Sequence, residues 1–129
     1  MISILIIDEN QAVTTLLEEA LADDTHHVQT AQDSQAALKL LREHSFDLVI
    51  ADVNMPKLGG FEVIIKVNSM QPRPRVIAMT GYTGSQDKEY MAGVADSLNI
   101  ECLLYKPFSM SELIASVFLH EECAESVEI

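Results

Sequence analysis

The chain has 129 residues, a length typical of one domain, and its hydrophobic share of 48% excludes a disordered protein. Asp and Glu number 20 against 8 Lys and Arg, so the formal charge is −12. A chain this acidic is repelled by phosphate backbones and anionic lipid. We therefore expect no direct binding to nucleic acid or membrane, and instead affinity for divalent cations and basic partner surfaces.

The cysteines and the N-terminus bear on the cellular compartment. Cys102 lies in an apolar run and Cys123 in an acidic segment, which indicates reduced thiols rather than a disulfide framework. No apolar stretch approaches the ~20 residues of a membrane span. Residues 1–4 lack the basic region of a signal peptide. We predict a cytoplasmic protein.

Short apolar runs alternate with helical periodicity along the chain. The runs that predict strands are residues 2–7, 28–31, 48–51, 76–79 and 102–105. Most of them lack alternating polar residues, as do strands buried on both faces of a parallel sheet. The helical stripes that follow them in turn are Val13, Leu16, Leu17, Ala20 and Leu21; Ala37, Leu40 and Leu41; Phe61, Ile64 and Ile65; Met91, Val94, Ala95 and Leu98; and Ile114, Val117 and Phe118.

Local signals mark the helix ends. Asp33 is a predicted N-cap, residues 109–112 (SMSE) have a capping-box pattern, and residues 71–74 (QPRP) stop the third helix. Strand and helix therefore alternate five times. This order predicts an α/β fold, a doubly wound five-stranded parallel sheet of flavodoxin-like order 2-1-3-4-5 with helices on both faces. Ligands of such sheets bind outside the carboxyl ends of the strands, between strands 1 and 3.

Reactive residue types gather at those carboxyl ends. Asp8 and Glu9 follow the first strand, Asp52 the third, Thr80 the fourth and Lys106 the fifth. Three carboxylates in one place repel one another unless a cation joins them, and hard oxygen ligands suit Mg²⁺. A lysine and a hydroxyl beside them make a phosphoryl-transfer site, in which Asp52 can act as a nucleophile and form an acyl phosphate.

These residues also resemble the signature of the receiver domain of two-component response regulators. The match covers nearly the whole chain, and its most specific parts are residues 47–56 (DLVIADVNMP) with Gly60, 77–81 (IAMTG) and 105–108 (YKPF). The resemblance implies that Asp52 is the phosphoacceptor of a phosphorelay. Its donor would be a histidine kinase or a histidine phosphotransfer protein, and the domain would be no enzyme apart from its own phosphorylation and dephosphorylation at Asp52.

The resemblance also implies roles for the neighbours of Asp52. Asp8, Glu9, Asp52 and the backbone carbonyl of Asn54 would hold Mg²⁺. Lys106 would contact the phosphoryl group, and its bond to Pro107 resembles one that is cis in the family. Thr80 resembles the switch hydroxyl.

Two positions, Asn54 and Tyr82, resemble those that tune acyl-phosphate hydrolysis. A downstream protein partner would bind through the surface of the fourth helix and fifth strand. No output domain follows in these 129 residues, so we expect a single receiver domain over 1–129, similar to chemotaxis regulators, or an excised receiver, with 119–129 as an acidic tail or helix end.

Four residues depart from the family pattern. Glu9 and Gly59 stand where Asp is frequent, and Gly81 stands where Ala or Ser is common. Leu103, three residues before Lys106, occupies the position of the usual switch aromatic. Tyr105 lies on the same strand face and is a partial substitute.

Three other functions compete with this interpretation. A pseudo-receiver, which signals without phosphate, is favoured by Glu9 and Leu103 and opposed by the intact Asp8, Asp52, Thr80 and Lys106. A haloacid-dehalogenase-type hydrolase needs an acidic residue where Asn54 stands. A nucleotide-binding Rossmann protein is disfavoured because the turn after the first strand is acidic and not glycine-rich.

The histidines and the C-terminus carry weaker signals. We place His26, His27, His44 and His120 on loops or helix ends, and zinc binding by His120 and Cys123 lacks further ligands. The acidic residues after Leu119 predict a solvated helix end, with docking to a basic partner as the alternative.

Overall fold

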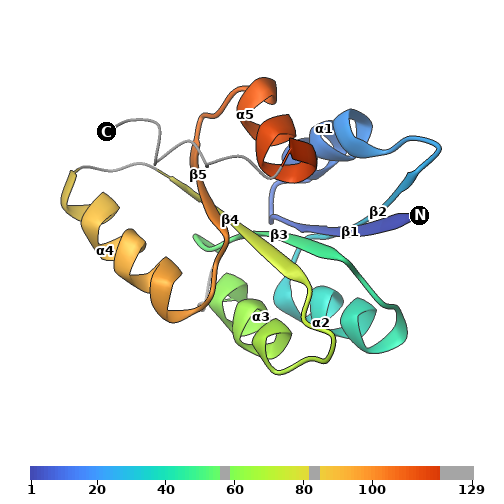
Figure 1. Ribbon diagram of the computed structural model, residues 1–129, viewed down its shortest axis with the longest axis horizontal. Coiled ribbons are helices and arrows are strands. Elements are labelled where there is room, and N and C mark those ends of the chain that lie inside the picture. Colours follow the sequence, from blue (N-terminus) through green and yellow to red (C-terminus); the bar gives the residue numbers. More distant parts are fainter. Residues whose placement is uncertain (56–58, 82–84, 120–129) are drawn as a thin grey trace.

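The computed structural model describes residues 1–55, 59–81 and 85–119. Its centre is a five-stranded parallel sheet in the order β2-β1-β3-β4-β5, as predicted (Figure 1). The strands are β1 (Ile2–Ile7), β2 (His26–Ala31), β3 (Leu48–Asp52), β4 (Arg75–Gly81) and β5 (Cys102–Lys106). Each predicted strand is present.

Helices cover both faces of the sheet. They are α1 (Gln11–Leu21), α2 (Ser34–Glu43), α3 (Gly59–Asn68), α4 (Ser85–Ser97) and α5 (Met110–Ile114), which continues into a π-helical segment, Ala115–Leu119. Helices α1 and α5 lie on one side of the sheet, and α2, α3 and α4 lie on the other (Figure 1). This is the doubly wound arrangement predicted from the alternation of strands and helices.

The apolar runs are explained by two cores, one on each face. In β1, Leu5 and Ile7 pack with the α2–α4 side, whereas Ile4 and Ile6 pack with the α1–α5 side. All four side chains are fully buried. Because successive side chains of a strand point to opposite faces, a strand between two layers of helices needs apolar residues at every position.

The helix caps form as predicted, but two of the predicted stripes are less buried than expected. Asp33 Oδ1 accepts a hydrogen bond from the Ala36 amide, and the Ser109 hydroxyl accepts one from the Glu112 amide. On α1 the buried residues are Thr14, Leu17 and Leu21, while Leu16 is exposed. On α3, Ile65 is exposed. The shifts arise because each helix is rotated so that only part of its apolar stripe faces the sheet.

One further expectation was wrong, and the predicted C-terminal helix has a local irregularity. His26 and His27 lie in β2 rather than in a loop, because their backbones pair with Ile2 and Ser3 of β1. The C-terminal helix widens into a π-helical segment after Ile114. There the Ser116 hydroxyl donates a hydrogen bond to the Glu112 carbonyl, and such back-bonding competes with regular helical hydrogen bonds.

The carboxyl ends of the strands lie close to the start of α3. A Cβ atom on Gly60 would lie only 2.1 Å from the Asp52 carbonyl oxygen, so only glycine allows the helix to pass so near the end of β3. Within the described part of the chain, no helix is both long and apolar enough to span a bilayer.

Candidate functional site

Sheet register brings the predicted site residues together. Ile7 pairs with Ala51, Asp52 with Met79, and Gly81 with Lys106. Asp52, Thr80 and Lys106 are therefore the last or nearly the last residues of adjacent strands, and Asp8 directly follows β1. Four chain segments that are far apart in sequence meet at one edge of the sheet, as the sequence predicts.

A lysine joins two buried carboxylates at this edge. Lys106 Nζ lies 2.6 Å from Asp8 Oδ2 and 3.4 Å from Asp52 Oδ2. The Asp8 and Asp52 side chains are 1% and 6% exposed, whereas the Lys106 side chain is 28% exposed. One positive charge therefore faces two negative charges, and the cluster keeps an excess of one negative charge.

Backbone amides orient both carboxylates. Asp8 Oδ1 accepts a hydrogen bond of 2.9 Å from the Asn10 amide, and Asp52 Oδ1 accepts one of 2.8 Å from the Asn54 amide. The other oxygen of Asp52, Oδ2, lies 3.4 Å from Lys106 Nζ, which is farther than Asp8 Oδ2 lies from the same nitrogen. Oδ2 is therefore the oxygen best placed to accept an incoming group. The loops after β1 and β3 thus hold the acidic groups before any ligand arrives.

The surroundings of Lys106 act on its pKa in opposite directions. Desolvation is the largest single effect and favours the neutral amine. The hydrogen bond to Asp8 and the charges of Asp52 and Asp8 together outweigh it, so the pKa of Lys106 is raised. The ammonium form is therefore the one held between the carboxylates at neutral pH.

The side chain of Asn54 connects β3 to the end of β4. Its Oδ1 accepts hydrogen bonds from the Thr80 hydroxyl at 3.0 Å and from the Gly81 amide at 2.6 Å. The sequence singled out Asn54 for its backbone carbonyl and as a tuning position, but not for this bridge. Its residue type carried no such signal, because the two strands meet only in the folded sheet.

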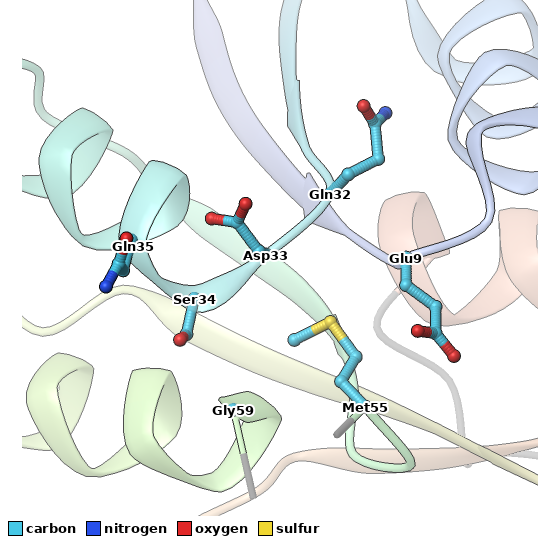
Figure 2. Close-up of a pocket in the computed structure, with 7 residues that line it drawn as sticks. All are labelled: Glu9, Gln32, Asp33, Ser34, Gln35, Met55 and Gly59. Carbon is cyan, nitrogen blue, oxygen red and sulfur yellow. The ribbon is translucent and has the colours of Figure 1, made fainter. Parts of the chain in front are cut away.

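Glu9 departs from the predicted cluster of three carboxylates. It is exposed, and it lines a pocket of about 380 Å³ together with the β2–α2 turn and residues Met55 and Gly59 (Figure 2). Asp8 turns into the sheet edge while its neighbour faces solvent. Among the residues that the structure describes, no three His, Cys, Asp or Glu side chains are arranged to hold a metal ion.

The two buried carboxylates nevertheless suit a divalent cation. They are hard oxygen donors, their net charge with Lys106 is negative, and each carboxylate oxygen has more than one lone pair to offer. The donor set at the sheet edge therefore fits Mg²⁺, with Glu9 beside it rather than within it.

The structure shows how the residues that depart from the family pattern are packed. Leu103 is completely buried in the core on the α2–α4 side, and Tyr105 is partly buried against the same core, so the two share a strand face as predicted. A Cβ on Gly59 would lie 3.3 Å from Ser34 Cβ, whereas a Cβ on Gly81 would have ordinary room, 3.7 Å from Asn54 Oδ1. The peptide bond between Lys106 and Pro107 is cis. Tyr82 lies outside the described residues.

Comparison with known proteins agrees with this fold and identifies the family. The family model of the response regulator receiver domain matches residues 4–118. Response regulator ArlR of Staphylococcus aureus (strain Mu50 / ATCC 700699) is 31% identical over 117 residues, which cover 91% of this chain and 51% of ArlR. The chain belongs to the response regulator receiver domain family.

Solved structures show the same relationship. The Vibrio cholerae chemotaxis protein CheY4 superposes with a TM-score of 0.75 at 28% identity, over 91% of this chain and 96% of CheY4. A response regulator receiver domain protein from Clostridium thermocellum superposes with a TM-score of 0.74 at 30% identity, over 88% of each chain. The chain spans about half the length of the curated relatives it matches. It is a receiver domain of two-component signalling.

Proposed function

We propose that Asp52 is the phosphoacceptor of this receiver domain and that a histidine kinase or a histidine phosphotransfer protein supplies the phosphoryl group. The observation that carries the proposal is the geometry of Asp52. Its carboxylate is buried at the end of β3, oriented by the Asn54 amide, and faces an ammonium that it shares with Asp8. A buried acid that served only as a turn residue would not need this shared cation.

The transfer forms an acyl phosphate. Asp52 Oδ2 attacks the phosphorus of a phosphohistidine, the bond from phosphorus to the imidazole nitrogen breaks, and the imidazole leaves with the bonding electron pair and takes up a proton. Lys106 Nζ is placed to stabilise negative charge on the phosphoryl oxygens. In hydrolysis, water attacks the same phosphorus, the bond from phosphorus to Asp52 Oδ2 breaks, and inorganic phosphate leaves with the Asp52 carboxylate restored. The domain is a signalling module, and these two steps at Asp52 are the chemistry we assign to it.

Receiver domains generally bind Mg²⁺ at the phosphorylation site. Here Asp8, Asp52 and the Asn54 carbonyl would hold the ion, and the exposed Glu9 carboxylate would serve it from the side of the pocket. When bound, Mg²⁺ supplies charge neutralisation for the transferring phosphoryl group. Within the chain, the Lys106 ammonium also neutralises phosphoryl charge. Its hydrogen bond to Asp8 keeps it beside Asp52.

The signal leaves the site through Thr80 and the fourth helix. The Thr80 hydroxyl is held by Asn54 Oδ1, so a phosphoryl group on Asp52 competes with Asn54 for this donor. The segment that starts at Thr80 leads into α4, and Tyr105 lies beside Thr80 in the sheet register. We assign the output to the surface of α4 and β5, with a protein partner in the cytoplasm. Leu103, which carries no hydroxyl, leaves Tyr105 as the responding aromatic ring on that strand face.

The test is intact mass after incubation with Mg²⁺ and a small-molecule phosphodonor. We expect a single phosphoryl adduct on the wild type and none on Asp52→Asn, with Asp47→Asn as the matched control because Asp47 is an acid at the opposite ends of the strands. A purified histidine kinase is the second donor. If neither donor labels the folded wild type, Asp52 is not a phosphoacceptor and the domain signals without phosphate.

A further inference from the structure

An apolar groove between α3 and α4 is not used by the proposed phosphorylation site. It has a volume of about 670 Å³ and is lined mainly by Phe61, Ile65, Tyr90, Gly93, Val94 and Leu98. Two of its large side chains are unusually open, since Ile65 is 59% and Tyr90 68% exposed. Exposed apolar surface collected in a groove indicates an interaction site more than single scattered residues do.

The glycine in this groove is not explained by packing within the chain. Gly93 lies inside α4, where glycine is less favourable than alanine. A Cβ atom placed on Gly93 would meet nothing within 4 Å. The fold itself therefore has room for a side chain that the sequence does not supply, and the missing side chain leaves space for a partner to approach the helix closely.

A hydrogen bond connects the two walls of the groove. Asn68 Nδ2, at the end of α3, donates a 2.6 Å hydrogen bond to the Leu98 carbonyl just after α4. Outside the groove, Asn54 Oδ1 accepts hydrogen bonds from Thr80 and Gly81 and so joins the loop after β3 to the end of β4. A groove with walls tied in this way is preformed, which lowers the ordering cost of binding.

We propose that the α3–α4 groove binds an amphipathic helix of a partner protein, with basic side chains flanking its apolar stripe. The lining residues recur at helical spacing on both walls, the pattern into which a third helix packs its side chains. Charge selects the partner. The chain carries −12, and exposed Glu62 and Asp96 lie one helical turn from Ile65 and Gly93, with Lys66 as the opposing charge on α3. A second copy of so acidic a chain is repelled, whereas a basic helix is attracted. The inference does not depend on phosphorylation of Asp52.

The test is a nuclear magnetic resonance titration of the ¹⁵N-labelled full chain with a synthetic helical peptide of about 16 residues, roughly four turns. Its Leu side chains form one stripe and its Lys side chains flank it. Two matched peptides have Glu in place of Lys, or the same composition with the stripe scrambled. We expect saturable shifts at α3 and α4 with the basic amphipathic peptide, and affinity lower by about tenfold or more for the other two.

Variants of the chain test the location. Gly93→Leu fills the groove and should weaken binding by about tenfold or more. Gly93→Ala adds a small side chain and should change binding by less than about threefold. Leucine and alanine both favour a helix more than glycine does, so neither substitution should unfold α4. The pair Glu62→Lys and Asp96→Lys should weaken binding several-fold, and the matched pair Glu18→Lys and Glu19→Lys on α1 should do so less. Circular dichroism confirms that each variant is folded.

Three results would overturn the proposal. The first is no saturable binding up to about 1 mM peptide. The second is equal binding of the scrambled peptide, or shifts confined to α1 and α5, since either would show charge attraction without a groove. The third is a concentration-dependent dimer in analytical ultracentrifugation that Gly93→Leu abolishes, because the occupant would then be a second copy of this chain.

Discussion

The two edges of the sheet, where the strands begin and where they end, both contain ion pairs, but the ion pairs have different roles. At the edge where the strands begin, the Arg75 guanidinium binds Glu101 and also donates to the carbonyls of Ser116 and Val117. At the edge where the strands end, Lys106 serves both Asp8 and Asp52. The Arg75 ion pair matches one cation with one carboxylate and two carbonyl acceptors, whereas the Lys106 cluster has one negative charge in excess; we call the two the balanced edge and the reactive edge after these ion pairs.

The Arg75–Glu101 ion pair is structural, whereas the cluster of Lys106 with Asp8 and Asp52 is reactive. Arg75 presents a rigid planar fork that satisfies several acceptors and fastens the C-terminal helix to β4. Lys106 is a compact charge on a flexible stem, and its ammonium can follow a ligand that changes the charge of Asp52. A cluster that lacks one positive charge is prepared to receive a cation together with an anionic group, and an ion pair that is already balanced is not.

The largest expected effect comes from removing the cation of the reactive edge. Lys106→Met should slow phosphoryl uptake from a small-molecule donor by about 100-fold or more, because one preorganised donor to the phosphoryl oxygens is lost. The rate is measured by quenched intact mass spectrometry. Lys39→Met, which removes an exposed lysine of α2, is the control and should leave the rate unchanged. An equal loss in both variants would assign the effect to overall charge.

The next largest effect should come from removing the Arg75 cation of the balanced edge. Arg75→Met should lower the free energy of unfolding by about 2 kcal/mol, since the hydrogen bonds from Arg75 to the Glu101 carboxylate and to two helix carbonyls are lost. Urea unfolding measures the change, and Arg42→Met, at an exposed position of α2, is the matched control. Phosphoryl uptake should persist in Arg75→Met. If uptake falls as far as it does in Lys106→Met, the two edges are not independent.

A smaller effect should follow from adding Mg²⁺. At a concentration about five times its Kd, a ligand that binds the folded state stabilises it by roughly 1 kcal/mol. We expect this stabilisation in the wild type, its loss in Asp8→Asn, and a partial loss in Glu9→Gln, since Glu9 is exposed beside the buried pair. Thermal unfolding with and without Mg²⁺ is the measurement. An equal loss in both variants would place Glu9 in the metal site on the same footing as Asp8.

The smallest effect concerns Asp23, an exposed acid paired with the partly buried His26 at the start of β2. The side-chain hydrogen bond from His26, with the Thr25 amide next, lowers the pKa of Asp23 from 3.8 to about 2. A carboxyl whose pKa is lower in the folded state adds stability above pH 3.8, and this contribution is lost as the pH falls through 2. A ¹³C titration of the Asp23 carboxyl should give a midpoint near 2 in the wild type and nearer 3.8 in His26→Gln. A midpoint that does not respond to His26 would contradict the assigned cause.

The sequence predicted the reactive edge far better than the balanced one. Asp8, Asp52, Thr80 and Lys106 each end or follow an apolar strand, and parallel strands bring their ends to one edge, so order alone places them together. Arg75 gave no such signal, because its partners Glu101, Ser116 and Val117 lie 26 to 42 residues away. Asn54 stood within a recognisable motif, yet its bridge to Thr80 and Gly81 depends on side-chain direction, which the motif does not state.

The sequence by itself determined the order of strands and helices, the receiver family, and the edge at which the chemistry lies. These follow from local hydrophobic periodicity and from residue types at strand ends. Only the tertiary structure decided that Glu9 faces a pocket while Asp8 is buried, that Leu16 and Ile65 leave their predicted stripes for solvent, and that α3 and α4 enclose a groove at Gly93. The exposure of Leu16 and Ile65 and the groove depend on how each helix is rotated against the sheet, and the orientation of Glu9 depends on the path of the loop after β1; both are set by the packing of all elements together.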